Sequence, residues 1–494
     1  MADLVSSPFS RMFLIENGAA PNHSPVYEGL WKAGALSVGQ GTSTPIRIPS
    51  KDAYGKFVTV GSIQGDAPLP ELPVTARYTL DLSDLLRLAN LGCTNDVQVH
   101  MGTCQLPSNF NGGWDKILVL ETAKISDYKT TELGALEPGD NAVVDEPVTF
   151  QGQLVFEIKK LSATEVATSN ITGEVVAVSV CDQAGCGGTC GSASDGCQKV
   201  FFVQLAGGVS PGIEASVVYS DDGMSTSAKT GIATLAIGEA PTDSACVGDN
   251  LVVVSNDSDS LHYANISDIL TASETWTEVG TGFVGAKGPN AIWSIGPSET
   301  WIVGNGGYIY FTEDPTSSVT VQDAGVATAQ NLNDVHAFDS EHAVAVGASN
   351  AVVRTTDGST WGAKTGPAIG VALNAVWMKS ADVWFVGTAG GALYYTTDGG
   401  DSWTLKGFSG SGSGSIEDIY FANNTVGYMS HTTAAGVGRL FRTVDGGNSW
   451  VVGPESGSMP DNDKINSVKA CDPNTVFAGG LGGGASDGFG VKIS

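Results

Sequence analysis

The stretch that decides the fold of this chain is Thr396-Thr397-Asp398-Gly399-Gly400-Asp401-Ser402-Trp403. It returns almost unchanged at residues 443–450 and, one residue shorter, at residues 355–361. The aspartates of the three copies lie 41 and 47 residues apart, a spacing typical of the four-stranded repeats of ring-shaped β proteins. The repeat therefore predicts a series of small antiparallel sheets.

These segments resemble the Asp-box, or BNR, motif of β-propellers, and their residue types suit that role. An aspartate in a tight turn accepts hydrogen bonds from backbone amides, and a glycine after it adopts a left-handed conformation. The tryptophan packs as an apolar plug between neighbouring sheets. The box is therefore expected to be structural, joining the third and fourth strands of a blade. The residues concerned are Asp314, in a weaker copy, Asp357, Trp361, Asp398, Trp403, Asp445 and Trp450.

Strand pairs of one shape precede the boxes, as residues 290–296 followed by 300–304 illustrate. Further copies of this pattern begin near Val175, Asp243, Asn333, Ile416 and Ile465. The count predicts a seven-bladed propeller over residues 161–494. The last copy stops at Ser494 before its box, so residues 163–170 are expected to supply the missing outer strand and close the ring.

Composition and charge narrow the function. With 65 glycines and 15% charged residues among 494, the chain suits short strands and tight turns. No secretion signal and no run of roughly 18 apolar residues occurs, so we expect synthesis in a cytoplasm and no membrane span. The net charge is −28, of which residues 161–494 carry −22. Such a surface repels nucleic acids and anionic membranes.

Eight cysteines suggest a covalent or metal-bound feature. Four of them, Cys181, Cys186, Cys190 and Cys197, fall within 17 residues of a Gly/Ser-rich connection in the first blade. Four sulfurs on one loop bind zinc or form two disulfides, and the usual paired spacing of a zinc site is missing. Zinc, disulfides and free thiols all stay open, and no other cofactor is expected. Of the rest, Cys93 and Cys104 flank one strand and are candidates for a disulfide, whereas Cys246 and Cys471 are expected as small buried hydrophobes.

Residues 1–160 predict a separate domain of mixed composition. Strand-like runs alternate with long loops, and residues 82–92 have the apolar spacing, polar start and glycine stop of one helix. Runs at residues 47–57, 97–102, 110–117 and 133–142 resemble virion proteins of long-tailed bacteriophages, in particular their tail-tube, or major tail, proteins. That resemblance implies a β-sandwich with one helix. The expected fold class is therefore mainly β, a sandwich over 1–160 followed by the propeller.

The resemblance also implies a function. Tail-tube domains assemble into stacked, usually hexameric, rings through which DNA passes without sequence-specific contact. The chain is thus expected to be a non-enzymatic bacteriophage structural protein of the virion tail, a homo-oligomer touching other tail proteins and no membrane, with the propeller as an outward decoration.

Three alternatives stay open beside it. A virion protein that binds a receptor or carbohydrate could use strand aromatics such as Tyr394, Tyr395 and Tyr420. Sialidase-like glycoside hydrolases also carry Asp-boxes, but they gather several arginines, and residues 161–494 contain only Arg354, Arg439 and Arg442 at separated repeat positions. A photosystem-assembly factor shares the repeat length but leaves residues 1–160 unexplained, so it is less favoured. No catalytic residue is predicted.

Overall fold

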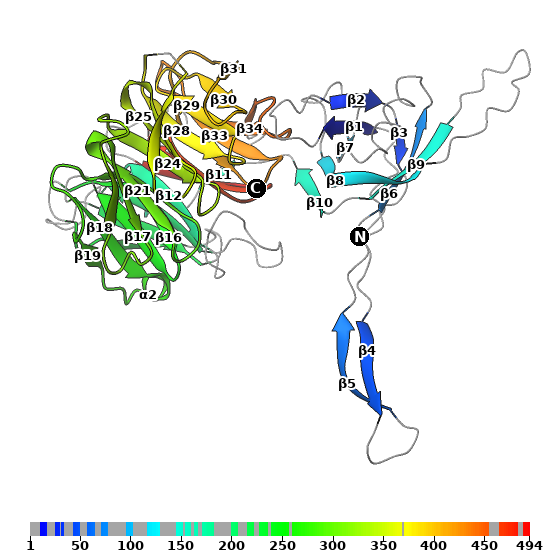
Figure 1. Ribbon diagram of the computed structural model, residues 1–494, viewed down its shortest axis with the longest axis horizontal. Helices are drawn as coiled ribbons and strands as arrows, with labels where there is room; N and C mark the ends of the chain where they lie inside the picture. Colours follow the sequence, from blue (N-terminus) through cyan, green and yellow to red (C-terminus); the bar gives the residue numbers. More distant parts are fainter. Residues whose placement is uncertain are drawn as a thin grey trace, which may run out of the picture. The chain divides into compact units, whose positions relative to one another are not determined.

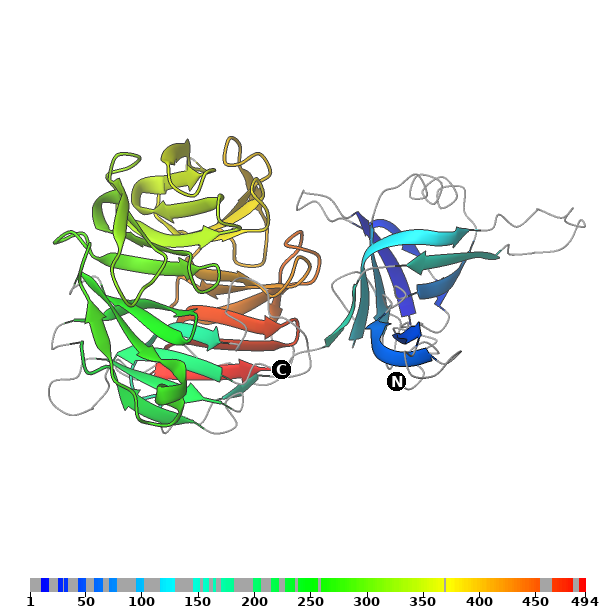
Figure 2. The same ribbon diagram turned by 60° about the horizontal axis from the view of Figure 1, so that its bottom comes forward.

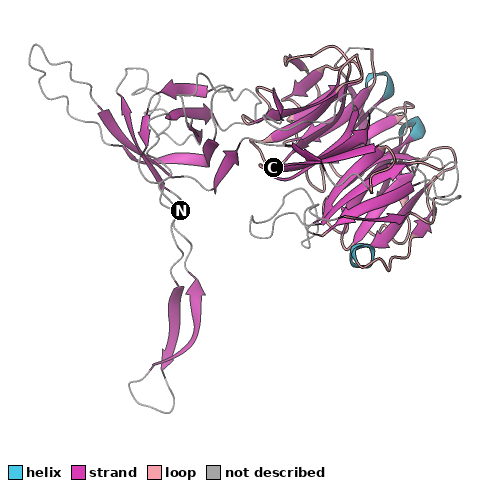
Figure 3. Cartoon of the chain, turned by 180° about the vertical axis from the view of Figure 1, so that it is seen from behind, coloured by secondary structure: helices cyan, strands magenta, loops and turns pink. Residues whose placement is uncertain are grey.

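The computed structural model divides the chain into two compact units, residues 1–18 with 23–159 and residues 19–22 with 160–494. Strands are the dominant element in both (Figure 3). No helix in the described part of the chain is long and apolar enough to cross a membrane. The structure describes residues 10–16, 25–29, 31–33, 43–49, 57–64, 71–77, 95–101, 116–128, 145–151, 154–159, 163–165, 170–181, 199–205, 215–221, 227–235, 239–255, 259–367, 370–453, 464–482 and 488–494.

The described strands of the first unit connect into one eight-stranded sheet with the order β2-β1-β7-β8-β9-β6-β3, to which β10 is added by pairing with β8. A separate hairpin joins β4 to β5. The strands are β1 (Ser10–Glu16), β2 (Pro25–Gly29), β3 (Trp31–Ala33), β4 (Ser43–Pro49), β5 (Phe57–Gln64), β6 (Glu71–Arg77), β7 (Asn95–Met101), β8 (Lys116–Tyr128), β9 (Asp145–Gln151) and β10 (Leu154–Lys159).

The described strands of this unit do not by themselves show the predicted sandwich. Strand β8 is 13 residues long. Its first half pairs with β7 and β10 and its second half with β9. The described strands therefore show an antiparallel β unit, and the sandwich with one helix stays a prediction. The helix predicted over 82–92 and the cysteines Cys93 and Cys104 lie outside the described residues.

The second unit contains seven four-stranded antiparallel sheets in the described residues, fanned around a common axis as in a β-propeller (Figure 1, Figure 2). We number them sheet 1 to sheet 7 from their innermost strands. Sheet 1 consists of β12 (Val175–Cys181), β13 (Lys199–Leu205), β14 (Ala215–Ser220) and β15 (Ala228–Gly231), and sheet 2 consists of β16 (Pro241–Val247), β17 (Asn250–Ser255), β18 (Ser260–Asn265) and β19 (Thr277–Val279). Sheet 3 consists of β20 (Pro289–Ser294), β21 (Thr300–Gly304), β22 (Tyr308–Thr312) and β23 (Thr320–Ala324). Sheet 4 consists of β24 (Leu332–Ala337), β25 (Ala343–Gly347), β26 (Ala351–Thr355) and β27 (Trp361–Thr365).

Sheets 5 to 7 complete the series. They consist of β28 (Leu373–Met378), β29 (Trp384–Thr388), β30 (Leu393–Thr396) and β31 (Thr404–Lys406); β32 (Ser415–Phe421), β33 (Gly427–Thr432), β34 (Gly438–Thr443) and β35 (Val451–Gly453); and β36 (Lys464–Asp472), β37 (Thr475–Leu481), β38 (Gly488–Ile493) and β11 (Ala163–Glu165). Short helical turns are α2 (Ile266–Leu270), η1 (Asn305–Gly307) and η2 (Ala348–Asn350).

The outer strand of sheet 7 comes from upstream, within the segment that the sequence predicted. Residues 163–165 of β11 pair antiparallel with residues 491–493 of β38. The innermost strands also contact one another in order, and β36 contacts β12, so the series returns to its start. Apolar side chains of β12, β13 and β37 share one core cluster across this junction, among them Val175, Phe202 and Phe477. Strand pairing thus attaches the segment upstream of sheet 1 to sheet 7, and core packing joins sheets 7 and 1.

Every innermost strand carries the same irregularity. A one-residue register shift follows the first paired residue in five of the seven strands and the second paired residue in β32 and β36. A bulge of this kind leaves one residue unpaired and re-aims the side chains around it. In five of these strands the unpaired residue is Thr242, Asn290, Asn333, Asn374 or Asn466. The bulge prepares these polar side chains to reach the next sheet.

Candidate functional site

The Asp-box turns link the third and fourth strands of sheets 4, 5 and 6. In sheet 5 the Asp398 carboxylate accepts from Thr396 Oγ1 at 2.7 Å, from the Ser402 N–H at 2.9 Å and from Ser402 Oγ at 2.5 Å. Asp445 repeats these contacts in sheet 6 with the same distances. Hydrogen bonds lower the pKa of Asp398 to about 2. The carboxylate of each aspartate forms its hydrogen bonds within its own turn, so its role is structural.

The box tryptophans reach back to the preceding sheet. Trp361 Nε1 donates to Gln322 Oε1 in sheet 3 at 2.9 Å, and Trp403 Nε1 donates to the Thr365 carbonyl in sheet 4 at 2.8 Å. Trp450 is 5% exposed and packs edge-on against Phe385 of sheet 5. These rings occupy the seams between sheets. The weaker box in sheet 3 keeps the turn, since Asp314 accepts from the Thr316 N–H at 2.9 Å.

A second set of hydrogen bonds crosses the seams near the axis. The bulged residue of an inner strand donates to the carbonyl of the first strand residue in the next sheet at four junctions. The pairs are Thr242 with Pro289 at 3.1 Å, Asn290 with Leu332 at 2.8 Å, Asn333 with Leu373 at 2.9 Å, and Asn466 with Val175 at 2.9 Å. The last pair joins sheet 7 to sheet 1 with the geometry used elsewhere in the series.

The residue after each bulge alternates between a small side chain and an aspartate. In order from sheet 1 these residues are Ala177, Asp243, Ala291, Asp334, Ala375, Asp418 and Ser467. Each aspartate accepts a backbone N–H of the following sheet. The bonds run from Ile292 to Asp243 at 3.0 Å, from Val376 to Asp334 at 2.7 Å and from Val468 to Asp418 at 2.9 Å. Every second seam is therefore bridged by a carboxyl group.

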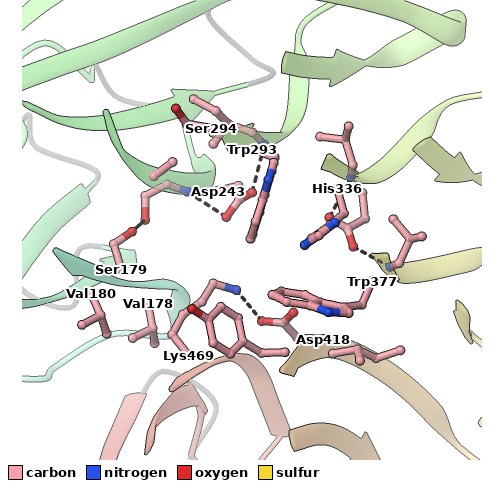
Figure 4. Close-up of a pocket in the computed structure, with 18 residues that line it drawn as sticks. Val178, Ser179, Val180, Asp243, Trp293, Ser294, His336, Trp377, Asp418 and Lys469 are labelled. Carbon is pink, nitrogen blue, oxygen red and sulfur yellow. Dashed lines mark hydrogen bonds and ion pairs between the residues drawn. The ribbon is translucent and has the colours of Figure 1, made fainter. Parts of the chain in front are cut away.

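These aspartates line a cavity on the axis, with a volume of about 100 Å³. All seven innermost strands contribute to its lining. Figure 4 shows the side chains of Asp243, His336, Trp377 and Lys469 converging on this space from different sheets. A volume of this size is several times what one water molecule needs. The cavity can therefore accommodate a small organic group.

One wall of the cavity is aromatic. Trp293, His336, Trp377 and Tyr420 hold the same position in the inner strands of sheets 3 to 6. Ring centroids lie 4.2 Å apart for Trp293 and His336, 4.1 Å for His336 and Trp377, and 4.8 Å for Trp377 and Tyr420. Lys469 holds this position in sheet 7, and its Nζ lies 5.4 Å from the Tyr420 ring centroid. Successive sheets thus build a continuous aromatic arc that ends in an ammonium group.

Three carboxyl groups share this one ammonium group. Lys469 Nζ lies 2.9 Å from Asp418 Oδ2, with the two side chains 21% and 16% exposed. Burial lowers the pKa of Lys469, but Asp418, Asp243 and Asp334 outweigh that effect and raise it above its ordinary value. Burial raises the pKa of Asp334 to about 8, and the neighbouring Asp418 and Asp243 add to the shift. Burial also raises the pKa of Asp243 to about 6, although Lys469 opposes the change.

The His336 ring leaves one polar atom unused. Its Nδ1 accepts from the Met378 N–H at 3.3 Å, which places the proton of the neutral ring on Nε2. Burial lowers the pKa of His336 to about 3, and Lys469 adds to that shift, so the ring is neutral near pH 7. The side chain is 4% exposed, and no described residue accepts a hydrogen bond from Nε2. The cavity therefore contains a buried donor that lacks an acceptor.

The cysteines differ from the prediction. Cys181, at the end of β12, forms a disulfide with Cys246 in β16, and their Cα atoms lie 5.7 Å apart. The prediction grouped Cys181 with Cys186, Cys190 and Cys197, which lie outside the described residues, and treated Cys246 as a buried hydrophobe. The packing of sheet 1 against sheet 2 brings Cys181 next to Cys246, although three other cysteines lie nearer to Cys181 in the sequence. Cys471, also expected as a hydrophobe, is disulfide-bonded as well. A four-cysteine zinc site that includes Cys181 is thus not what the structure contains. No group of His, Cys, Asp or Glu suited to a metal ion occurs in the described residues.

The arginines and tyrosines singled out from the sequence are dispersed. Arg354 pairs with Asp382 at 2.9 Å in sheet 5, and Arg442 donates to the Pro473 carbonyl in sheet 7 at 3.0 Å. Tyr395 is buried in a core cluster, and only Tyr420 lines the cavity among the three tyrosines.

Sequence reasoning missed the cavity itself. The signal that could have found it is the alternation of alanine and aspartate after the bulge, which becomes visible once the repeats are aligned on their inner strands.

Comparisons with known proteins place the second unit among β-propellers. The model of the family described as photosynthesis system II assembly factor YCF48 matches residues 315–467, from sheet 3 into sheet 7. Among solved structures, YCF48 from Cyanidioschyzon merolae covers 67% of this chain and 98% of its own, with 14% identity and a TM-score of 0.49. The match to virginiamycin B lyase from Staphylococcus aureus covers 68% of this chain and 99% of the lyase, with 13% identity and a TM-score of 0.50. The match to a streptogramin B lyase covers 68% of this chain and 97% of the lyase, with 12% identity and a TM-score of 0.51. Identities this low show the fold alone. No curated protein sequence matches the chain.

These findings overturn the prediction of a bacteriophage tail-tube or other virion protein. The family match falls on the assembly-factor alternative, which the sequence analysis ranked behind the virion interpretation. The family match lies within residues 315–467 and gives no evidence for a tail-tube similarity of residues 1–160. The runs behind that resemblance are strand and glycine-loop patterns, which recur in unrelated β domains because the same turns and pleats demand them. The stacked rings, the DNA in their lumen and the virion location rested on that resemblance and lose their basis with it.

Proposed function

We propose that residues 160–494 form a closed seven-bladed propeller that serves as a non-enzymatic binding module for a segment of a partner protein. The axial cavity is the proposed binding site. The observation that carries the proposal is the aromatic arc of Trp293, His336, Trp377 and Tyr420, which four successive sheets bring to one concave surface. Concave sites with aromatic walls and a few convergent polar groups are the usual form of ligand sites in proteins.

The hydrogen bonding of the cavity favours binding over catalysis. The carboxyl groups of Asp243, Asp334 and Asp418 each hold a backbone N–H of the next sheet. A general base needs a carboxylate that is free to take a proton from the substrate within hydrogen-bond reach. The Oδ2 atom of each of these aspartates already accepts the N–H of the next sheet, which leaves the group less available to take a proton from a substrate. The cavity is therefore better suited to hold a group than to transform it.

The family match supports a protein as the partner. The matched family is described as an assembly factor of photosystem II, and one solved structure is of YCF48 bound to the D1 peptide. For the present chain we infer the same general class of task, the transient binding of a protein segment during assembly of a larger complex. Seven sheets joined by seam hydrogen bonds and one donated strand supply a rigid frame for such a site.

Selection from random peptides displayed on mRNA tests this proposal. The bait is the full chain, and the variant Tyr420→Ala removes one ring of the arc at a half-buried position. Tyr394→Ala is the matched control, because Tyr394 is also half-buried but lies on β30 outside the cavity. We expect enriched peptides to bind the wild type and the control equally and to lose at least about tenfold in affinity for Tyr420→Ala. Peptides that bind all three proteins equally would show that the cavity is not the site.

A further inference from the structure

We propose that the axial cavity recognises a primary ammonium or guanidinium group, so that the bound segment presents a lysine or arginine side chain to the aromatic arc. This inference rests on the proposed function and specifies its ligand. It depends on the composition of the cavity wall, on the balance of charged groups inside it, and on the buried His336 donor that lacks a partner.

The aromatic arc supplies the first part of the site. Trp293 and Trp377 meet edge to face at 5.5 Å between centroids, with His336 against both rings. Cations within about 6 Å of an indole or phenol face are attracted by the negative face of the ring. The protein already uses this contact once, since Lys469 Nζ lies 5.4 Å from the Tyr420 centroid. The remaining rings offer the same attraction to an incoming cation.

The balance of charged groups supplies the second part. The titratable groups that line the cavity are Asp243, Asp334, His336, Asp418, Tyr420 and Lys469. Three are carboxyl groups and only Lys469 is a cation near pH 7. Within the described residues, Asp418 Oδ2 accepts from Ser467 Oγ, from the Val468 N–H and from Lys469 Nζ, whereas Oδ1 accepts no hydrogen bond. One carboxylate oxygen is therefore left for a ligand donor.

The unused His336 donor is the independent sign of a ligand. A buried N–H without an acceptor has lost its hydrogen bonds to water and gained none in return, so such groups are normally satisfied. Figure 4 shows the ring directed into the space between the other labelled side chains. A lone metal or alkylammonium ion offers no acceptor to this N–H. A peptide does, because each of its units carries a carbonyl oxygen.

Binding of a cation is expected to release a proton. The raised pKa of Asp334, about 8, means that this carboxyl group is mostly protonated at pH 7. A positive charge placed near Asp334 favours the ionised form of its carboxyl group. The ligand therefore replaces a proton, and this exchange distinguishes a cation in the cavity from a cation on the outer acidic surface.

The test uses four small probes and the full chain. The probes are the Nα-acetyl amides of lysine, arginine, norleucine and glutamate, and binding is followed by tryptophan fluorescence and by calorimetry. We expect the lysine and arginine probes to bind at least about tenfold more tightly than norleucine and the glutamate probe not to bind. Asp418→Asn should weaken the lysine probe about tenfold. Asp401→Asn is the matched control, because Asp401 is an exposed carboxylate paired with Lys364 away from the cavity.

Proton release is measured from the heat of binding at pH 7 in two buffers with different ionisation enthalpies. We expect a net release in the wild type that is lost in Asp334→Asn. Equal binding of the lysine and norleucine probes, or equal binding to the wild type and Asp418→Asn, would overturn the inference. Should those results occur while selected peptides still depend on Tyr420, the cation preference alone is wrong. Should selected peptides be indifferent to Tyr420 as well, the proposed binding function fails.

Discussion

Replacing Trp450 with alanine is expected to be among the most costly single changes in the second unit. The side chain is 5% exposed and lies in a core cluster with Phe385, Phe421 and Phe441. Its ring centroid is 5.8 Å from that of Phe421 in its own sheet and 6.4 Å from that of Phe385 in the preceding sheet. A buried tryptophan removes at most about 250 Å² from water, or about 6 kcal/mol at 25 cal/mol per Å².

Relaxation of the neighbours recovers part of that amount, and buried tryptophans in general lose 3–5 kcal/mol on truncation. We therefore expect Trp450→Ala to lower the free energy of unfolding by about 4 kcal/mol. Trp403→Ala should cost roughly half as much, because Trp403 is only partly buried and contributes a hydrogen bond to the Thr365 carbonyl. Leu405→Ala is the control, since Leu405 is 54% exposed and should change stability by less than about 0.5 kcal/mol.

The assay is urea unfolding of the full chain followed by tryptophan fluorescence. Eight of the ten tryptophans lie in residues 161–494, so the signal reports mainly on the second unit even when one is removed. With an unchanged slope, the shift in midpoint converts directly into a change in free energy. The reasoning would be refuted if Trp450→Ala cost less than about 1 kcal/mol, or no more than Leu405→Ala.

Three further predictions concern the seams. The pKa of Asp334 is about 8 in the folded state and about 3.9 in the unfolded state, so the stability that this group contributes is full below pH 4 and falls as the pH rises toward 8. The unfolding midpoint of the wild type relative to that of Asp334→Asn should therefore fall between pH 5 and pH 8. A difference between the two midpoints that does not change with pH would contradict this prediction. Cys246→Ser removes the disulfide to Cys181 across 65 residues and should cost about 2–4 kcal/mol, with the linked peptides absent from an unreduced digest of the variant but present in the wild type. Asn466→Ala and Asn290→Ala each remove one seam hydrogen bond of the same geometry, so each should lower the free energy of unfolding by about 1 kcal/mol. If urea unfolding shows a much smaller loss for Asn466→Ala than for Asn290→Ala, the junction between sheets 7 and 1 is not closed.

The sequence was sufficient for features that depend on short chain segments. An Asp-box turn is complete within eight residues, and Asp398 finds its partners Thr396 and Ser402 inside that span. The 41- and 47-residue spacing of the boxes then indicated repeated four-stranded sheets, and the end of the last repeat indicated a strand donated from upstream. Local turn chemistry and the period of a repeat are enough for such inferences.

The cavity and the disulfide were decided only by the tertiary structure. Asp243, Asp334 and Asp418 are separated by whole repeats, and they meet because bulged inner strands point the same position of each sheet toward one axis. Cys181 and Cys246 are 65 residues apart and become neighbours only when sheets 1 and 2 pack together. The first unit was interpreted from strand-like runs, one helical pattern and a resemblance of short segments to another family. Such runs fix that strands form but not which strands pair, because pairing partners are chosen by contacts between distant segments.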